Sequence, residues 1–151
     1  KGKTHVLHII RELLSFEPTS KGTDMAQALQ YFANAQKRHC TAFLISDFIG
    51  TGAVDKPLLI ASNRHEVNAI QIYDRREAEL PNIGLVKFHD AESNSNLWID
   101  TSLATIRNNY AQAWKQNQDS LEQLFTRTGV KHVSVRTDED YVKALMHLFR
   151  C

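Results

Sequence analysis

The chain has 151 residues, which suits one domain, and 42% of them are hydrophobic, as in ordinary globular proteins. Its 18 Lys and Arg against 17 Asp and Glu leave a formal net charge of +1, which provides no field to gather nucleic acid or anionic lipid. Two cysteines, Cys40 and Cys151, exclude a disulfide framework and a Cys-rich zinc site, and no apolar run approaches the roughly 18 residues of a membrane span. We therefore expect a cytoplasmic domain with no membrane segment in this chain.

Two helices are expected at the start of the chain. Apolar residues recur every three or four positions from Val6 to Phe16, and Pro18 ends this pattern. Thr23 or Asp24 can cap a second helix, which fades near residue 38. The apolar face of this second helix consists of Met25, Ala28, Leu29 and Phe32.

A strand, a helix and a strand follow as one βαβ unit. The apolar run 41–45, closed by Ser46 and Asp47, predicts a parallel strand that is buried on both faces. Residues 57–64 predict a short helix with a proline in its first turn, and residues 67–73 predict the next strand.

A hairpin and a long helix come next. The short runs 85–89 and 97–99, separated by polar residues, predict the two strands of the hairpin. One of residues 100–102 can cap a helix that runs to about Thr126 and stops at Gly129. The expected buried side of this helix comprises Leu103, Ile106, Tyr110, Trp114, Leu121, Leu124 and Phe125.

The chain closes with a strand over 130–135 and a helix for which Thr137 is the expected cap. The apolar stripe of this last helix consists of Tyr141, Leu145, Leu148 and Phe149. Strands that alternate with helices predict an α/β fold, with a mostly parallel sheet, helices on both faces and right-handed crossovers.

Three of the predicted strands end in a carboxylate, at Asp47, Asp74 and Asp138. Ligands of open α/β sheets bind at the carboxyl ends of the strands, and oxygen ligands gathered there, with Thr23 on a preceding loop, suit Mg²⁺ or Mn²⁺. Each carboxylate also has a structural alternative. Asp47 can stabilise a turn, Asp74 can pair with Arg75 or Arg76, and Asp138 can complement the dipole of the last helix.

Charged residues crowd together ahead of Pro81. Arg75, Arg76, Glu77 and Glu79 are typical of a solvated loop with weak ion pairs. The alternative is a docking loop, in which Asp74, Arg75 and Glu77 contact a partner.

Other motifs give little support for an enzyme. Trp98 can anchor an interface, whereas Trp114 is expected in the core. His39 adjoins Cys40 without a further soft ligand at metal spacing. Phosphate-binding GxxxxGK, dinucleotide-binding GxGxxG and nucleophile GxSxG motifs are all missing.

Several linked blocks carry a resemblance to a known family. They are Leu13-Leu14-Ser15-Phe16-Glu17-Pro18, Gly22-Thr23-Asp24, Phe43-Leu44-Ile45-Ser46-Asp47-Phe48, Arg64-His65-Glu66-Val67 and Asp74-Arg75-Arg76-Glu77-Ala78-Glu79-Leu80-Pro81, continued by Asp100-Thr101-Ser102 and Thr137-Asp138-Glu139-Asp140-Tyr141. In these blocks the chain resembles the bacterial family catalogued as domain of unknown function 58, over essentially its whole length.

Members of that family look like von Willebrand factor A domains, whose metal-ion-dependent adhesion site combines a DxSxS loop, a threonine loop and an aspartate loop. The resemblance implies that Thr23 and Asp47 belong to the latter two loops. No DxSxS occurs in this chain, and in such domains it follows the central first strand. We therefore expect residues 1–151 to be the carboxyl-terminal part of a larger domain, with Mg²⁺ or Mn²⁺ in the intact protein and no cofactor in this chain.

Without that first strand, the run 41–45 is expected to present an open edge through which the chain self-associates. Genes of the family often neighbour those of MoxR-type AAA+ ATPases, which implies a protein partner of that type and an adaptor role. We expect a non-catalytic binding module. The alternatives are a magnesium-dependent hydrolase that uses Asp47 and Asp74, and an interaction domain without metal.

Overall fold

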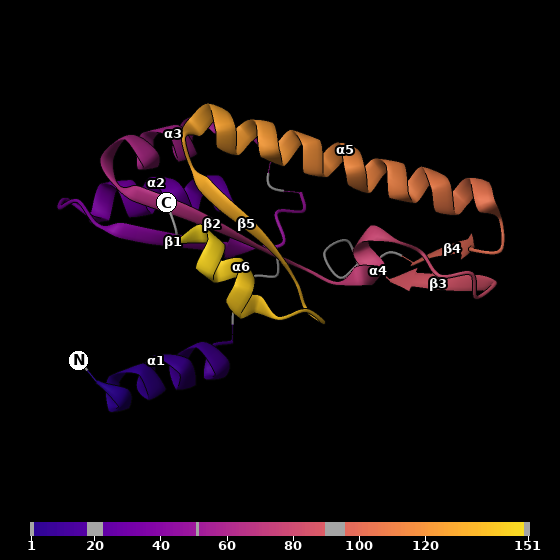
Figure 1. The fold of residues 1–151 in the computed structure, drawn as a ribbon, viewed down its shortest axis with the longest axis horizontal. Helices are drawn as coiled ribbons and strands as arrows, with labels where there is room; N and C mark the ends of the chain where they lie inside the picture. Colours follow the sequence, from indigo (N-terminus) through magenta and orange to yellow (C-terminus); the bar gives the residue numbers. More distant parts are fainter. Residues whose placement is uncertain (1, 18–22, 51, 90–95, 150–151) are drawn as a thin grey trace.

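The computed structural model describes residues 2–17, 23–50, 52–89 and 96–149, and within them it confirms the α/β fold class (Figure 1). The elements in chain order are α1 (Lys3–Ser15), α2 (Met25–Ala35), β1 (Thr41–Ser46), α3 (Asp55–Arg64), β2 (Glu66–Tyr73), α4 (Arg75–Ala78), β3 (Leu85–His89), β4 (Asn96–Asp100), α5 (Ala104–Thr128), β5 (Lys131–Arg136) and α6 (Tyr141–Leu148). In this described part of the chain, no helix has the length and apolar character to cross a membrane.

The main sheet has the strand order β1-β2-β5, with both pairings parallel. Thr41 pairs with Glu66 at the start of β1, and Tyr73 pairs with Arg136 at the end of β5. Because β2 lies in the centre, it is the most buried strand. Since all three strands run the same way, their carboxyl ends form one edge of the sheet, which we call the carboxyl rim.

Helices cover both faces of this sheet. On one face, α2, α3 and the carboxyl half of α5 enclose the core. The core consists of Met25, Leu29, Phe48, Val54, Leu58, Ala61, Val67, Ala69, Leu121, Leu124, Phe125 and Val130. The short helix α6 lies on the other face, where the ring of Phe149 packs edge-on against Phe43 at a centroid distance of 5.8 Å.

β1 differs from its prediction, because it is not buried on both faces. Ala42 and Leu44 are half-buried on the side of the core, while Phe43 and Ile45 are 46% and 59% exposed on the side of α6. The eight-residue α6 packs on β5 and is too short to cover β1 as well. β1 is also an edge strand, since it pairs with β2 alone among the described residues.

The first helix forms as predicted, but it buries nothing. None of the residues of α1 is buried, and Leu13, Leu14 and Phe16 are 72%, 84% and 74% exposed. An isolated helix of this length is marginal in water, so an apolar face of this kind normally packs against another surface.

Several helix ends differ from the sequence prediction. Asp24 caps α2, which ends at Ala35, three residues before the expected position. The cap of α5 is Leu103 rather than one of residues 100–102, and the cap of α6 is Asp140 rather than Thr137. Ala28, expected on the buried face of α2, is exposed. Short polar side chains compete for caps, and a sequence does not show which one faces the free backbone N–H groups.

The long helix α5 extends past the sheet toward the hairpin formed by β3 and β4 (Figure 1). For this reason its predicted apolar side is buried only at the carboxyl end. Leu121, Leu124 and Phe125 are buried, whereas Ile106, Tyr110 and Trp114 are half-buried and Leu103 is exposed.

Candidate functional site at the carboxyl rim

The carboxyl rim brings together the strand ends that the sequence indicated. Asp47 directly follows β1, Asp74 directly follows β2, and Asp138 lies two positions after the end of β5. Two hydrogen bonds join the last two of these ends: the backbone N–H of Thr137 donates to the Tyr73 oxygen at 3.0 Å, and Thr137 Oγ1 donates to Asp74 Oδ2 at 3.3 Å. One carboxylate of each candidate site, Asp47 for the metal and Asp74 for the partner, therefore lies at this edge of the sheet.

Asp47 sits in a tight turn with an exposed side chain. Its Oδ1 accepts the backbone N–H of Ile49 at 3.1 Å, and Ser46 Oγ accepts that of Phe48 at 3.1 Å. Phe48 is the only non-glycine residue with positive φ, at 57°, in the described part of the chain. Its buried ring packs edge-on against Phe125 at 5.3 Å, and this packing holds the strained turn that directs Asp47 outward.

Gln71 fixes the backbone at this turn. It is 3% exposed in the middle of β2; its Nε2 donates to the Asp47 backbone oxygen at 3.3 Å, and its Oε1 accepts from Ser134 Oγ at 2.8 Å. Sequence reasoning missed this residue. The available signal was a polar amide inside the apolar strand 67–73, where an unpaired buried amide would be costly.

Asp74 is held by hydrogen bonds rather than by the ion pair considered from the sequence. Its Oδ1 accepts the backbone N–H of Arg76 at 2.8 Å and thereby caps the single turn of α4. The charged stretch expected to be a loop therefore begins as a helix. Arg75 instead pairs with Glu79 at 3.7 Å, and both side chains are well exposed.

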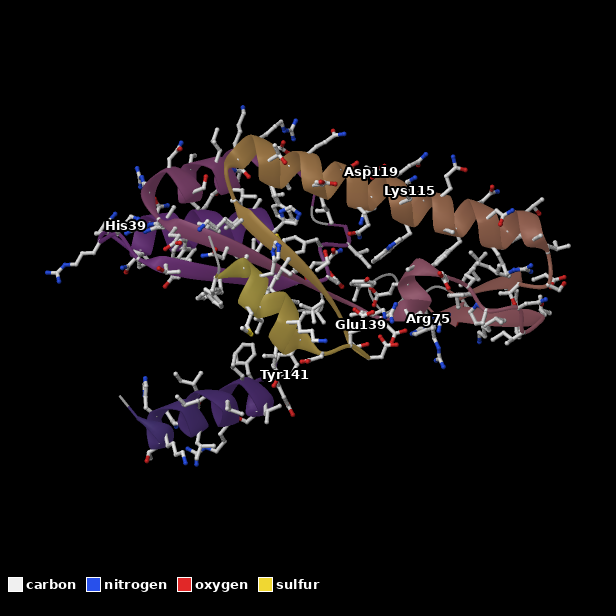
Figure 2. The ribbon with its side chains drawn as sticks, viewed as in Figure 1. His39, Arg75, Lys115, Asp119, Glu139 and Tyr141 are labelled. Atoms are coloured by element: carbon white, nitrogen blue, oxygen red, sulfur yellow. The ribbon has the colours of Figure 1, made fainter. Side chains whose placement is uncertain are left out.

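Asp138 pairs with Arg136, which also contacts Glu139 at 2.8 Å. The hydrogen bond from the Arg136 guanidinium lowers the pKa of Asp138 below its usual value, and the same bond raises the pKa of Arg136. Asp138 thus serves a local ion pair, while Asp140 caps the last helix. Figure 2 labels Glu139 and Arg75 in this charged region of the rim.

Thr23 lies at the same rim, because α2 runs antiparallel to β1. Near the carboxyl end of α2, the ring of Phe32 packs against His65, which precedes β2, at 4.7 Å. Because α2 is a continuous helix, its other end, at Met25, lies toward the opposite edge of the sheet, where β1 ends (Figure 1). Thr23, two residues before Met25 and exposed, is thus on the side of Asp47.

Glu77, a candidate partner contact, turns partly inward. Its side chain is half-buried, and its Oε2 is shielded from water without a hydrogen-bond partner among the described residues. It lies near Tyr110 of α5, whose pKa is raised by burial first and by the Glu77 charge second. Tyr110 also donates its hydroxyl to the Arg76 backbone oxygen at 3.3 Å, which ties α4 to α5.

The described residues contain no group of three or more His, Cys, Asp or Glu side chains that could hold a metal ion. At the opposite edge of the sheet, Cys40 Sγ lies 3.7 Å from His65 Nδ1. His65, distant in sequence, is thus a neighbour of Cys40 that spacing alone did not reveal. A cavity of about 600 Å³ lies between α4 and the hairpin.

Comparison with known proteins places the chain among proteins of unknown role. The family model described as "Protein of unknown function DUF58" matches residues 1–120. Uncharacterized proteins of Mycobacterium bovis and Mycobacterium tuberculosis are each 31% identical over 145 residues, a match that covers 93% of this chain and 45% of the relative. An uncharacterized protein of Mycobacterium avium is 30% identical over 135 residues, covering 88% of this chain and 78% of the relative.

The chain spans about half the length of the Mycobacterium bovis and Mycobacterium tuberculosis relatives that it matches. No solved structure matches the chain.

Proposed function

Because this chain belongs to the DUF58 family of proteins of unknown function, we propose that it is part of a non-catalytic protein-interaction module. The intact module has a von Willebrand factor A-like fold, and Mg²⁺ or Mn²⁺ at the carboxyl rim assists its binding. Its partner is a MoxR-type AAA+ ATPase, for which it acts as an adaptor. The resemblance set out above supports the fold and the partner in this proposal.

The observation that carries the proposal is the shared position of Thr23 and Asp47 at the carboxyl rim. Asp47 is exposed, and among the described residues it takes part in no ion pair. One hydroxyl and one carboxylate are hard oxygen donors, and Mg²⁺ commonly binds through one or two carboxylates while it keeps several waters. When bound, the ion supplies an open position for a carboxylate of the partner.

Thr23 and Asp47 would provide only part of the coordination sphere. The remaining protein oxygens come from the DxSxS loop that the family resemblance implies for the intact protein. Because the donors from this chain are few, we expect this chain alone to hold the ion weakly and the intact protein to hold it well.

The hydrolase alternative has less support from the rim. It needs Asp74 as a metal ligand beside Asp47, yet both Asp74 oxygens accept hydrogen bonds, from the Arg76 backbone and from Thr137. These bonds tie Asp74 to the cap of α4. Metal-assisted hydrolysis also requires a general base, and the sequence does not identify one.

Copurification of the intact protein with a tagged MoxR-type ATPase tests the proposal. We expect complex formation in Mg²⁺, loss of the complex in EDTA, and a matching loss in Asp47→Ala, while Asp74→Asn binds normally. If the protein turns over phosphate or peptide substrates and Asp47→Ala abolishes this activity, the hydrolase hypothesis would replace the adaptor hypothesis. A complex that persists in EDTA and in Asp47→Ala would show that the metal is not needed for binding. It would support the alternative of a purely structural interaction domain without metal.

A further inference from the structure

The cavity of about 600 Å³ between α4 and the hairpin has the character of a binding site. Its lining includes the apolar residues Leu80, Ile83, Val86 and Phe88 and the charged residues Arg75, Arg76 and Glu79. Pockets of this volume that combine an apolar lining with a few charged groups commonly bind ligands.

The apolar lining continues beyond the cavity along one face of the hairpin. In the antiparallel register, Phe88 lies opposite Leu97, so their side chains share a face. Leu97 is 61% exposed and Ile83 is 66% exposed. An apolar surface that extends from a cavity onto the exposed face of the hairpin suits a protein segment better than an enclosed small molecule.

The charged residues of the cavity lining indicate which kind of protein segment would fit. Arg75 is already paired with Glu79, and the nearby Asp138 is paired with Arg136. The guanidinium of Arg76 takes part in no ion pair within the described residues. The cavity lining thus carries the positive charges of Arg75 and Arg76 and the negative charge of Glu79. Because Arg75 pairs with Glu79, the positive charge of Arg76 is the one that a ligand can neutralise. A carboxylate is its complement, because it accepts paired hydrogen bonds from the arginine fork.

We propose that this cavity binds an acidic peptide segment of the partner protein. An apolar side chain of the segment packs against Val86 and Phe88, and a neighbouring carboxylate pairs with Arg76. This inference rests on the interaction function proposed above and gives it a partner chemistry.

The test uses random peptides displayed on phage and selected on the immobilised chain in metal-free buffer. We expect enrichment of peptides in which an apolar residue adjoins Asp or Glu. A synthetic copy of an enriched peptide should lose about tenfold or more in affinity for Arg76→Glu and for Leu97→Glu, as expected when a charged hydrogen bond or an apolar contact is lost.

Two matched variants control for charge and for exposure. Lys115→Glu makes the same charge reversal on α5, outside the cavity lining (Figure 2). Trp98→Glu changes a residue that is 60% exposed on the opposite face of the hairpin, since Trp98 pairs with Lys87. Both variants should keep the affinity of the unmodified chain. The proposal is overturned by enriched peptides without acidic residues, by binding that survives Arg76→Glu and Leu97→Glu, or by the absence of enrichment.

Other outcomes separate this inference from the function on which it rests. Peptide binding that depends on Asp47 and is unchanged by the cavity variants would contradict peptide binding in the cavity. The same result would still support the proposed interaction module. Octanoate that binds in the cavity without any enriched peptide would assign a small carboxylic acid instead. If peptides bind in the cavity but Mg²⁺ has no effect on partner binding by the intact protein, this inference would stand and the proposed role of the metal would be wrong.

Discussion

Gln71 ties the central strand to the turn that presents Asp47: its Nε2 lies 3.3 Å from the Asp47 backbone oxygen, and its Oε1 accepts from Ser134. A single buried amide thus connects all three strands close to the carboxyl rim. Because its donor and its acceptor are both used, the amide is satisfied in the interior.

We predict that Gln71→Met lowers the free energy of unfolding by about 1–3 kcal/mol, because it leaves the part-buried Asp47 backbone oxygen without its partner, whereas the exposed Ser134 hydroxyl can bond water instead. Urea titration measures the change. Ser134→Ala, which removes one bond and leaves the other, should cost less. A Gln71→Met protein as stable as the unmodified chain would show that the bridge is not needed.

Phe48 is expected to be among the most sensitive positions, because its ring is buried against Phe125. Phe48→Ala should destabilise the fold by about 3–5 kcal/mol, as for other buried aromatic truncations. Phe48→Gly should be no less stable than Phe48→Ala, since glycine adopts the positive φ without strain. Phe16→Ala, which truncates a ring that is 74% exposed, is the control and should leave the urea midpoint unchanged.

The pattern of helices and strands followed from the sequence, because hydrophobic periodicity reports which faces are buried. Glu66–Tyr73 was placed to within a residue, since its Val, Ile and Tyr residues favour a strand. The burial of β1 was overestimated, because the apolar run 41–45 is typical of a strand that is covered on both faces. Only the tertiary arrangement shows that α6 leaves Phe43 and Ile45 exposed.

For the candidate site, the sequence indicated the carboxylates at the strand ends but not their bonding. Topology alone brings Asp47, Asp74 and Asp138 to one edge, because parallel strands end together. Whether Asp74 caps α4 or forms an ion pair depends on side-chain geometry that spacing does not encode. Gln71 was missed because its partners lie 24 and 63 positions away in the chain.

The ion pair of Asp138 predicts a small pH dependence. The folded-state pKa of Asp138 is below its ordinary value, so the stabilisation is present above that value and is lost as the pH falls through the folded pKa. The difference in stability between the unmodified chain and Asp138→Asn should therefore shrink below about pH 4. The difference in stability should also shrink in high salt, because Asp138 is exposed and Arg136 is only half-buried.

A carboxyl-carbon NMR titration tests the cause of that shift directly. Arg136→Gln should raise the pKa of Asp138 toward the usual range, because the hydrogen bond that lowers this pKa most is gone. Ser102→Ala should leave Asp138 alone and instead raise the pKa of Asp100, which Ser102 lowers by two hydrogen bonds. An Asp138 midpoint that is the same with and without Arg136 would contradict the assignment.

The open edge of β1 predicts self-association of this chain. Ile45→Lys should reduce it, because a charged side chain on an edge strand opposes pairing with another chain. Light scattering over a range of concentrations measures the effect, and Trp98→Lys on the hairpin, with a similar exposure of 60%, serves as the control. A monomer at all concentrations would show that the edge is not used.

The central claim is that Thr23 and Asp47 hold one divalent ion together at the carboxyl rim. Calorimetric titration of Mg²⁺ into the intact protein, and into its Thr23→Ala and Asp47→Ala variants, tests it most directly. The account predicts one binding event that each variant weakens strongly, while the double variant adds little more, because both residues serve one ion. Unchanged Mg²⁺ binding in both single variants, or no binding by the intact protein, would contradict it.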